Sequence, residues 1–274
     1  MAVEIHPTAI VAEGAELADG VGVGPFCVLG PKVRLGEGTR LASHVVIEGR
    51  TELGAGNTVH AFAVLGGPPQ HTAYAGEDTQ LVIGDNNIIR EHVTMNTGTE
   101  DGGGTTTIGD RCMLMVGSHV GHDCHVGNDV TFANSTALGG HVSVGDFTVL
   151  GGHVAVLQFV QIGEGAMVSG VTGVAADIIP FGLAIGQRAF LHGINVVGMK
   201  RRGGSRDDIK DVWRAYRLLF YGGATFDERR SAFEREFGGH PFVGKIVDFI
   251  RSSRKRPLMM PEPSGQSAEA VEAV

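Results

Sequence analysis

Aliphatic residues return at every sixth position along most of the chain. One series runs from Ile5 to Leu65 and resumes at Ile83 and Ile89, and a second runs from Ile108 to Val174. A helix needs a period near 3.6 and a single strand a period of 2, so neither explains this spacing. A strict period of six is typical of β-solenoids, in which three short faces close a coil of about eighteen residues. The pattern therefore predicts a solenoid with the aliphatic residues stacked inside.

Two segments interrupt the period. Residues 66–80 contain Gly67-Pro68-Pro69-Gln70, and residues 100–107 contain Gly102-Gly103-Gly104. Insertions in repeat proteins leave the coil as loops, often on the binding face. Idle surface excursions are the alternative interpretation for each loop taken alone.

The hydrophobic spacing becomes helical after the repeat ends near Pro180. Ser205 with Asp208, and Thr225 with Glu228, have the spacing of N-terminal caps. A third helix is predicted from about Pro241 to Ser252. We therefore expect a solenoid domain over 1–190, a helical domain over 191–256 that caps the open end or packs on a neighbouring subunit, and a disordered tail over 257–274.

Composition limits the class of protein. The chain has 274 residues and a formal net charge of −8, which argues weakly against nucleic-acid binding. Its three cysteines lie inside repeat units and favour buried thiols in a reducing compartment over disulfides. No segment reads as a secretory signal or as the ~20 apolar residues of a transmembrane helix. A cytoplasmic protein is expected.

Four histidines, His119, His122, His125 and His141, cluster in the second series. In a coil of about eighteen residues, residue i lies under residue i+18. His122 should then lie beneath Gly140, with His141 as its neighbour and Gln158 one coil further on.

Three interpretations of this cluster remain open. The histidines could be solvated corner residues. They could bind zinc, as in γ-class carbonic anhydrases, although the spacing is not the usual one of those enzymes. Or His122 could be a general base oriented by Asp123, with the backbone N–H of Gly140 stabilising an oxyanion. A repeat-turn glycine is the plainer interpretation of Gly140.

The stretch Ser118-His119-Val120-Gly121-His122-Asp123-Cys124-His125-Val126-Gly127-Asn128 resembles the active-site segment of the UDP-N-acetylglucosamine O-acyltransferase family. Further matches follow in order along the chain. They are His6-Pro7-Thr8-Ala9-Ile10, Gly24-Pro25-Phe26-Cys27, Ser43-His44-Val45-Val46, Gly98-Thr99, Gly140-His141-Val142-Ser143, Gln158-Phe159, Asn195 and Gly198-Met199-Lys200-Arg201-Arg202-Gly203. The resemblance covers about residues 5 to 250.

The resemblance implies a mainly β fold, a left-handed parallel β-helix followed by a small C-terminal α-helical domain, assembled as a homotrimer with active sites between subunits. It also implies transfer of a (3R)-3-hydroxyacyl chain from acyl carrier protein to the 3-hydroxyl of UDP-N-acetylglucosamine, the first step of lipid A biosynthesis. The acyl donor implied by the resemblance is an acyl-phosphopantetheine, and no cofactor or metal is expected.

Roles for individual residues follow from the resemblance. His122 would be the general base, Asp123 its orienting carboxylate and Gly140 the oxyanion donor. Gly170 would be the ruler for acyl length, and a glycine there predicts a chain of about fourteen carbons rather than about ten. The implied substrate-binding residues are Gln70, His119, His141, Gln158, Asn195, Arg201 and Arg202.

Two departures from the family pattern concern the acceptor. The first loop usually carries Gln-Asp-x-Lys-Tyr, and here it has Gln70-His71-Thr72-Ala73-Tyr74. Leu157 stands where a histidine often precedes the Gln-Phe pair. An N-acyltransferase acting on the 3-amino analogue of the sugar nucleotide is therefore an alternative. A γ-carbonic-anhydrase-like zinc enzyme and a non-catalytic scaffold are further alternatives.

Cationic residues concentrate near the predicted helical domain despite the acidic net charge. They are Lys200, Arg201, Arg202, Arg251, Arg254, Lys255 and Arg256. A local basic patch can steer an acidic partner such as acyl carrier protein. Solvated surface charge is the alternative interpretation for the group from Arg251 to Arg256.

Overall fold

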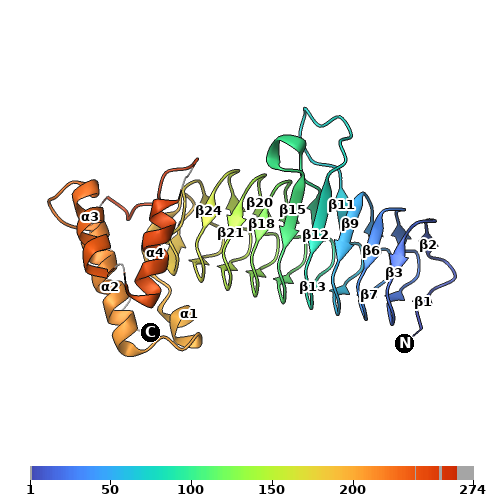
Figure 1. The fold of residues 1–274 in the computed structure, drawn as a ribbon, viewed down its shortest axis with the longest axis horizontal. Helices are drawn as coiled ribbons and strands as arrows, with labels where there is room; N and C mark the ends of the chain where they lie inside the picture. Colours follow the sequence, from blue (N-terminus) through green and yellow to red (C-terminus); the bar gives the residue numbers. More distant parts are fainter. Residues whose placement is uncertain (1, 238, 253–254, 264–274) are drawn as a thin grey trace.

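The computed structural model describes residues 2–237, 239–252 and 255–263. Short strands wind into a solenoid with three long sheets, and a helical domain follows at its C-terminal end (Figure 1). The strand pairs of the coils are parallel, as the family resemblance implies.

The three sheets are named A, B and C. Sheet A contains β1 (Glu4–Ile5), β4 (Gly22–Val23), β7 (Arg40–Leu41), β10 (Thr58–Val59), β13 (Ile88–Ile89), β16 (Met113–Leu114), β19 (Thr131–Phe132), β22 (Val149–Leu150), β25 (Met167–Val168), β27 (Gly182–Ile185) and β28 (Phe190–Ile194). Sheet B contains β2 (Ile10–Val11), β5 (Val28–Leu29), β8 (Val46–Ile47), β11 (Val64–Gly67), β14 (Thr94–Asn96), β17 (His119–Val120), β20 (Ala137–Leu138), β23 (Ala155–Val156) and β26 (Gly173–Val174). Sheet C contains β3 (Glu16–Leu17), β6 (Val33–Leu35), β9 (Arg50–Leu53), β12 (Gln80–Ile83), β15 (Thr105–Ile108), β18 (His125–Val126), β21 (Ser143–Val144) and β24 (Gln161–Ile162).

Each coil passes from sheet A to B to C, so the solenoid has three corners. Corner AB includes Gly151–His153 and 169–171, corner BC includes 121–123 and 139–141, and corner CA includes 145–147 and 163–165. The third residue of each corner often has the left-handed conformation, with φ of 58° at Asp123 and 61° at His141. This turn conformation directs the chain from one face to the next.

The stacking register confirms the eighteen-residue coil. Glu4 pairs with Gly22, whereas Val64 pairs with Thr94 and Thr94 with His119. Both longer steps are produced by insertions that connect sheet B to sheet C, one between β11 and β12 and one between β14 and β15. Both predicted loops therefore leave from corner BC, and Figure 1 shows them rising above β12 and β15.

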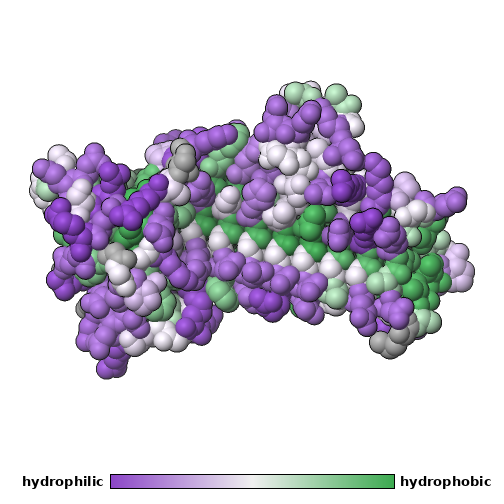
Figure 2. All heavy atoms as spheres, viewed as in Figure 1, coloured by the Kyte–Doolittle hydropathy of each residue, from purple (hydrophilic) through white to green (hydrophobic). Residues whose placement is uncertain are grey.

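The aliphatic residues of the period form the continuous core. Leu65, Leu114 and Leu150 are fully buried. On the outer face seen in Figure 2, a hydrophobic band also runs along the solenoid between hydrophilic rows. The prediction is wrong for the first coil, where Ile5 is 48% exposed. Among the described residues no coil lies below the first one, so its aliphatic side chains are not covered from that side.

The other end of the solenoid is covered. Strand β28 turns back antiparallel on β27, so the predicted boundary at residue 190 falls at the start of a strand of sheet A. The helices that follow are α1 (Val196–Arg201), α2 (Arg206–Phe220), α3 (Phe226–Phe237) and α4 (Pro241–Arg251). Helix α2 packs on β28, where the buried Tyr216 hydroxyl donates to the Leu191 carbonyl oxygen at 3.2 Å. Ser205 and Asp208 form the predicted capping box of α2.

The start of the predicted disordered tail is ordered. The Asp177 N–H donates to the Pro257 carbonyl oxygen at 2.8 Å, and the Met259 N–H donates to the Asp177 carbonyl oxygen at 2.7 Å. Met259 is buried against the core, so these backbone bonds and an apolar anchor hold the segment in place. Residues 264–274 lie outside the described residues.

Two sequence expectations concern the environment of the chain. None of the helices in the described ranges has the length and apolar character that a bilayer-spanning helix requires. Cys27, Cys112 and Cys124 are buried free thiols. Burial raises the pKa of the Cys112 thiol to about 11 and that of Cys124 to about 12, which makes both thiols unreactive.

Candidate active site

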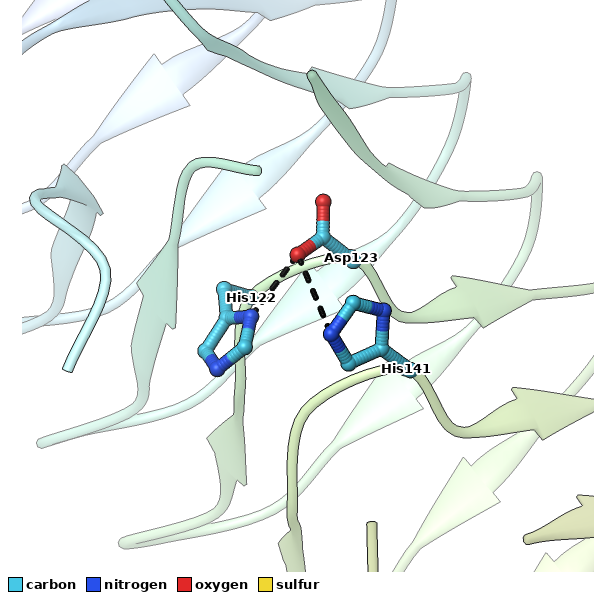
Figure 3. A group of neighbouring side chains, drawn as sticks. All are labelled: His122, Asp123 and His141. Atoms are coloured by element: carbon cyan, nitrogen blue, oxygen red, sulfur yellow. Dashed lines mark hydrogen bonds and ion pairs between the residues drawn. The ribbon is translucent and has the colours of Figure 1, made fainter. Parts of the chain in front are cut away.

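His122 and Asp123 form a buried pair at corner BC. They lie between β17 and β18, and Nδ1 of His122 is 2.7 Å from Oδ2 of Asp123 (Figure 3). His122 is 9% exposed and Asp123 2% exposed. A carboxylate at Nδ1 fixes the neutral ring with its proton on that nitrogen, so Nε2 keeps a free lone pair. The pair has the arrangement of a general base and its orienting carboxylate.

Thr99 holds the carboxylate of Asp123. Its backbone N–H donates to Oδ1 at 2.8 Å and its hydroxyl donates to Oδ2 at 2.6 Å. Burial by itself raises the pKa of Asp123, but the hydrogen bonds from Thr99 and His122 outweigh it and lower that pKa below its usual value. Asp123 is therefore an anion at neutral pH.

The second inserted loop covers this carboxylate. Thr99 caps a short 3₁₀ helix, Glu100–Gly102, and a β-carbon on Gly102 would come within 2.1 Å of the Asp123 carboxylate carbon. Only glycine allows the loop to approach so closely. The glycine-rich insertion is thus part of the site and not an idle excursion.

His141 lies one coil further on at the same corner. Its Nε2 is 3.7 Å from Oδ2 of Asp123 (Figure 3), and its ring stacks on Phe159 with centroids 4.4 Å apart. Burial lowers the pKa of His141, although the charge of Asp123 acts in the opposite direction. His141 is therefore suited to hydrogen bonding as a neutral ring.

Gly140 lies against the His122 ring, as the coil arithmetic predicts. A β-carbon on Gly140 would come within 2.5 Å of Cε1 and 2.6 Å of Nε2 of His122. Within the described part of the chain, the Gly140 N–H has no hydrogen-bond acceptor. A bare N–H beside the base can donate to an oxyanion.

Two more histidines border the pair. Nδ1 of His119 is 2.8 Å from the Thr94 hydroxyl, and burial lowers the pKa of His119. His71, from the first inserted loop, contacts the His122 ring edge-on with centroids 5.3 Å apart. Sequence reasoning named His71 only as a departure and gave Thr99 no role. The available signal was that His71 lies in the first segment that interrupts the period and that Thr99 directly precedes the second.

The remaining predicted residues do not all gather at corner BC. Gln70 is exposed on the first loop, and Gln158 is exposed at corner BC, where its carbonyl oxygen accepts from Arg256. Gly170 lies at corner AB. Within one chain, the acyl-length position and the catalytic pair are therefore on different corners.

Arg202 and Asn195 lie near corner CA. The Arg202 guanidinium packs between the rings of Phe147 and Phe181, at 5.4 and 5.2 Å from their centroids. Burial lowers its pKa, and one of its terminal nitrogens is buried without a hydrogen-bond partner. The Asn195 side chain caps α1 and donates to the Gly165 carbonyl oxygen at 3.0 Å. Arg201, the last residue of α1, is exposed.

A shallow cavity of about 270 Å³ opens beside the catalytic pair. Its lining residues are Gly102, Asp123, His125, His141, Ser143, Phe159, Gln161 and Lys255. It combines two imidazoles, a buried carboxylate and one lysine, which fits a polar substrate.

The same side chains are the candidate metal ligands. His122, Asp123 and His141 offer ligand atoms within 4.8 Å of one another. Zinc in a catalytic site takes three protein ligands at about 2.0–2.2 Å. Here Oδ2 of Asp123 already accepts the Thr99 hydroxyl and faces Nδ1 of His122, so the carboxylate is arranged as a hydrogen-bond acceptor for these groups.

Comparisons with known proteins agree with this geometry. Residues 177–259 match the family described as Udp N-acetylglucosamine O-acyltransferase, domain 2, and residues 105–140 match the bacterial transferase hexapeptide repeat. The acyl-[acyl-carrier-protein]–UDP-N-acetylglucosamine O-acyltransferase of Caulobacter vibrioides is 52% identical, over 94% of this chain and 98% of that protein. The protein of the same name from Azorhizobium caulinodans is 54% identical, over 94% and 95%.

Solved structures extend the likeness to the fold. The UDP-N-acetylglucosamine acyltransferase of Francisella novicida has a TM-score of 0.92 at 33% identity and covers 98% of both chains. LpxA from Acinetobacter baumannii has a TM-score of 0.90 at 37% identity, covering 93% of this chain and 99% of that one. The predicted left-handed β-helix with a C-terminal helical domain is confirmed. The chain belongs to the UDP-N-acetylglucosamine O-acyltransferase family of acyltransferases.

Proposed function

We propose that this enzyme transfers a (3R)-3-hydroxyacyl chain from acyl carrier protein to the 3-hydroxyl of UDP-N-acetylglucosamine, the first step of lipid A biosynthesis. The names of the relatives, which cover almost the whole chain, support these substrates. The observation that carries the chemistry is the 2.7 Å contact between His122 Nδ1 and the buried Asp123 carboxylate.

The proposed reaction needs only this chain's residues and the two substrates. Nε2 of His122 takes the proton of the sugar 3-hydroxyl, and that oxygen forms a bond to the thioester carbonyl carbon. The carbonyl oxygen becomes an oxyanion that accepts from the Gly140 N–H. When the C–S bond breaks, the leaving thiolate takes the proton from the His122 imidazolium, which Asp123 has stabilised. No cofactor enters this scheme.

A homotrimer with sites between subunits is part of the proposal. The catalytic pair lies at corner BC, whereas Gly170 lies at corner AB and Arg202 near corner CA. Packing corner BC of one subunit against another face of its neighbour would bring these groups together. The partnerless nitrogen of Arg202 supports a phosphate contact at such a site.

Exposed cations near the helical domain support docking of an acidic acyl carrier protein. Lys200 and Arg201 are exposed at the end of α1. Arg251 forms an ion pair with Glu234 at 2.8 Å, so its positive charge is partly neutralised and attracts an acidic partner less strongly. Arg254 lies outside the described residues. Buried free thiols support the cytoplasmic location.

The test is an acyl-transfer assay with defined acyl carrier proteins. His122→Ala should lower kcat by about a thousandfold, because a general base contributes about 10²–10⁴-fold. His6→Ala, which removes an exposed histidine of the first coil, should keep full activity. Retained transfer in His122→Ala with an intact fold would rule out the proposed base. Metal analysis of the active wild-type enzyme separates this scheme from the zinc alternative.

Acylation of the 3-amino analogue is the second candidate activity. The observation that favours it is His71, which contacts the catalytic pair from the loop position where the family pattern has an acidic residue. Rates on the two sugar nucleotides, measured with one acyl donor, decide between O- and N-acyl transfer.

A further inference from the structure

The segment after α4 returns to the solenoid beside the catalytic corner. Nε of Arg256 donates to the Gln158 carbonyl oxygen at 2.9 Å. Two backbone hydrogen bonds to Asp177 and the burial of Met259 hold the next residues. Lys255 directly precedes these anchored residues. The hydrogen bonds of Arg256 and of the following backbone therefore hold the Lys255 backbone near corner BC.

The side chain of Lys255 lines the cavity that Asp123 and His141 also line. Its ammonium lies 4.3 Å from the centroid of the Phe159 ring, and Phe159 stacks on His141. The aromatic face attracts the cation and limits where it can lie. Lys255 is thus aligned with the catalytic residues through two contacts.

Asp123 and Lys255 bring one negative and one positive charge to the cavity, but they are not paired with each other. Among the described residues no carboxylate forms an ion pair with this lysine. The carboxylate of the cavity, Asp123, is already satisfied by Thr99 and His122. A cation beside a polar cavity without an acidic partner is a binding group for an anion.

Both substrates of the proposed function carry phosphate. The acceptor contains a diphosphate, and the acyl donor is joined to its carrier through a phosphodiester. We propose that Lys255 binds a phosphate oxygen of one of these substrates during turnover and is a substrate-positioning residue of the site. This inference rests on the proposed function for the identity of the phosphate compounds.

The variant Lys255→Gln removes the charge and keeps most of the side chain, and Lys255→Arg keeps the charge. We expect Lys255→Gln to raise KM for one substrate about tenfold, with kcat within about twofold of wild type, because one charge-assisted hydrogen bond is lost. Lys255→Arg should restore most of the affinity. Lys210→Gln is the matched control, since Lys210 is exposed on α2 and pairs only with Asp207 among the described acids.

Two pairs of measurements distinguish the sources of the phosphate. One measures KM for UDP-N-acetylglucosamine at saturating donor. The other compares 3-hydroxyacyl-phosphopantetheine with 3-hydroxyacyl-pantetheine, which lacks the phosphate. A defect confined to the phosphorylated donor assigns the donor phosphodiester, and a defect confined to the sugar nucleotide assigns the diphosphate. Values within about twofold of wild type for both substrates would overturn the inference.

An error in the proposed function would give a different result from an error in the role of Lys255. In that case the wild-type enzyme itself shows no transfer to UDP-N-acetylglucosamine. Calorimetric titration of wild type and Lys255→Gln with UDP-N-acetylglucosamine and with phosphopantetheine then still tests Lys255. Weaker binding of either compound to Lys255→Gln supports the anion site, and equal binding of both refutes it.

Discussion

The imidazole of His122 occupies the space that a side chain on Gly140 would fill. A β-carbon at residue 140 would lie 2.5 Å from Cε1 of His122. Because Gly140 has no left-handed φ, close approach is what requires glycine at this position. Coil stacking thereby places Gly140 directly against the ring of the base.

Gly140→Ala should lower kcat by about a hundredfold, because the His122 ring must turn away from Asp123 and from the acceptor oxygen. Gly152→Ala is the matched control. Gly152 has the equivalent turn position at corner AB, and its β-carbon would meet its nearest atom at an ordinary 3.5 Å. Equal kcat values for the two variants would show that the ring tolerates the added carbon.

The free energy of unfolding should depend on pH through the carboxylate of Asp123. Its pKa is lowered in the folded state, so its stabilising effect is complete above its unfolded pKa of about 3.9 and is lost as pH falls through the folded pKa. Between about pH 5 and pH 2, the free energy of unfolding should fall more steeply for wild type than for Asp123→Asn. Urea unfolding across this range measures the difference. Asp101→Asn, an exposed carboxylate of the same loop, should keep the wild-type slope.

His71 should contribute to acceptor binding. Its Nδ1 accepts from the Ala73 N–H at 3.3 Å, so the neutral ring carries its proton on Nε2 and offers a donor near His122. His71→Ala should raise KM for the sugar nucleotide about fivefold and leave KM for the acyl carrier protein unchanged. Thr72→Ala, at an exposed neighbour on the loop, is the control. A fall in kcat at constant KM would instead indicate that His71 acts on the base.

Gly170 tests the acyl-length assignment. It is exposed at corner AB, and a β-carbon there would meet the Gly152 carbonyl oxygen at 3.3 Å. Wild type should prefer a chain of about fourteen carbons to one of about ten, and Gly170→Met should reverse this preference by about tenfold or more, because the larger side chain would occupy the space that the resemblance assigns to the end of the acyl chain. The ratio of rates with the two acyl carrier proteins measures it. Gly223→Met, where a β-carbon meets no atom within 4 Å, should keep the wild-type ratio.

Most of the scaffold could be predicted because the same contacts between neighbouring coils repeat along the chain. The period of six from Ile108 to Val174, with three faces to each coil of a solenoid, predicted a coil of eighteen residues. That coil placed His122, Gly140 and His141 together. The exposure of Ile5 and the ordering of Pro257 to Met260 were missed, because both depend on what lies at the ends of the solenoid.

The contributions of the loops to the site were less predictable. Thr99 and His71 reach the catalytic pair from insertions, and no period relates an inserted residue to the coil above or below it. Lys255 was predicted as part of a basic patch for an acidic partner, with solvated surface charge as the alternative, and its place in the cavity was not predicted. These contacts depend on tertiary packing, which hydrophobic spacing does not encode.

Both insertions leave the solenoid at corner BC and return in register, so β12 and β15 pair as though no residues had been added. Substrate choice and scaffold stability are therefore separable properties in this molecule. The first loop can change length or composition beside His122 at little cost to folding, because the coils keep their pairing, whereas the second loop is tied to Asp123 through Thr99. Acceptor specificity could thus diverge among related enzymes by loop exchange, while the base and its carboxylate stay in place.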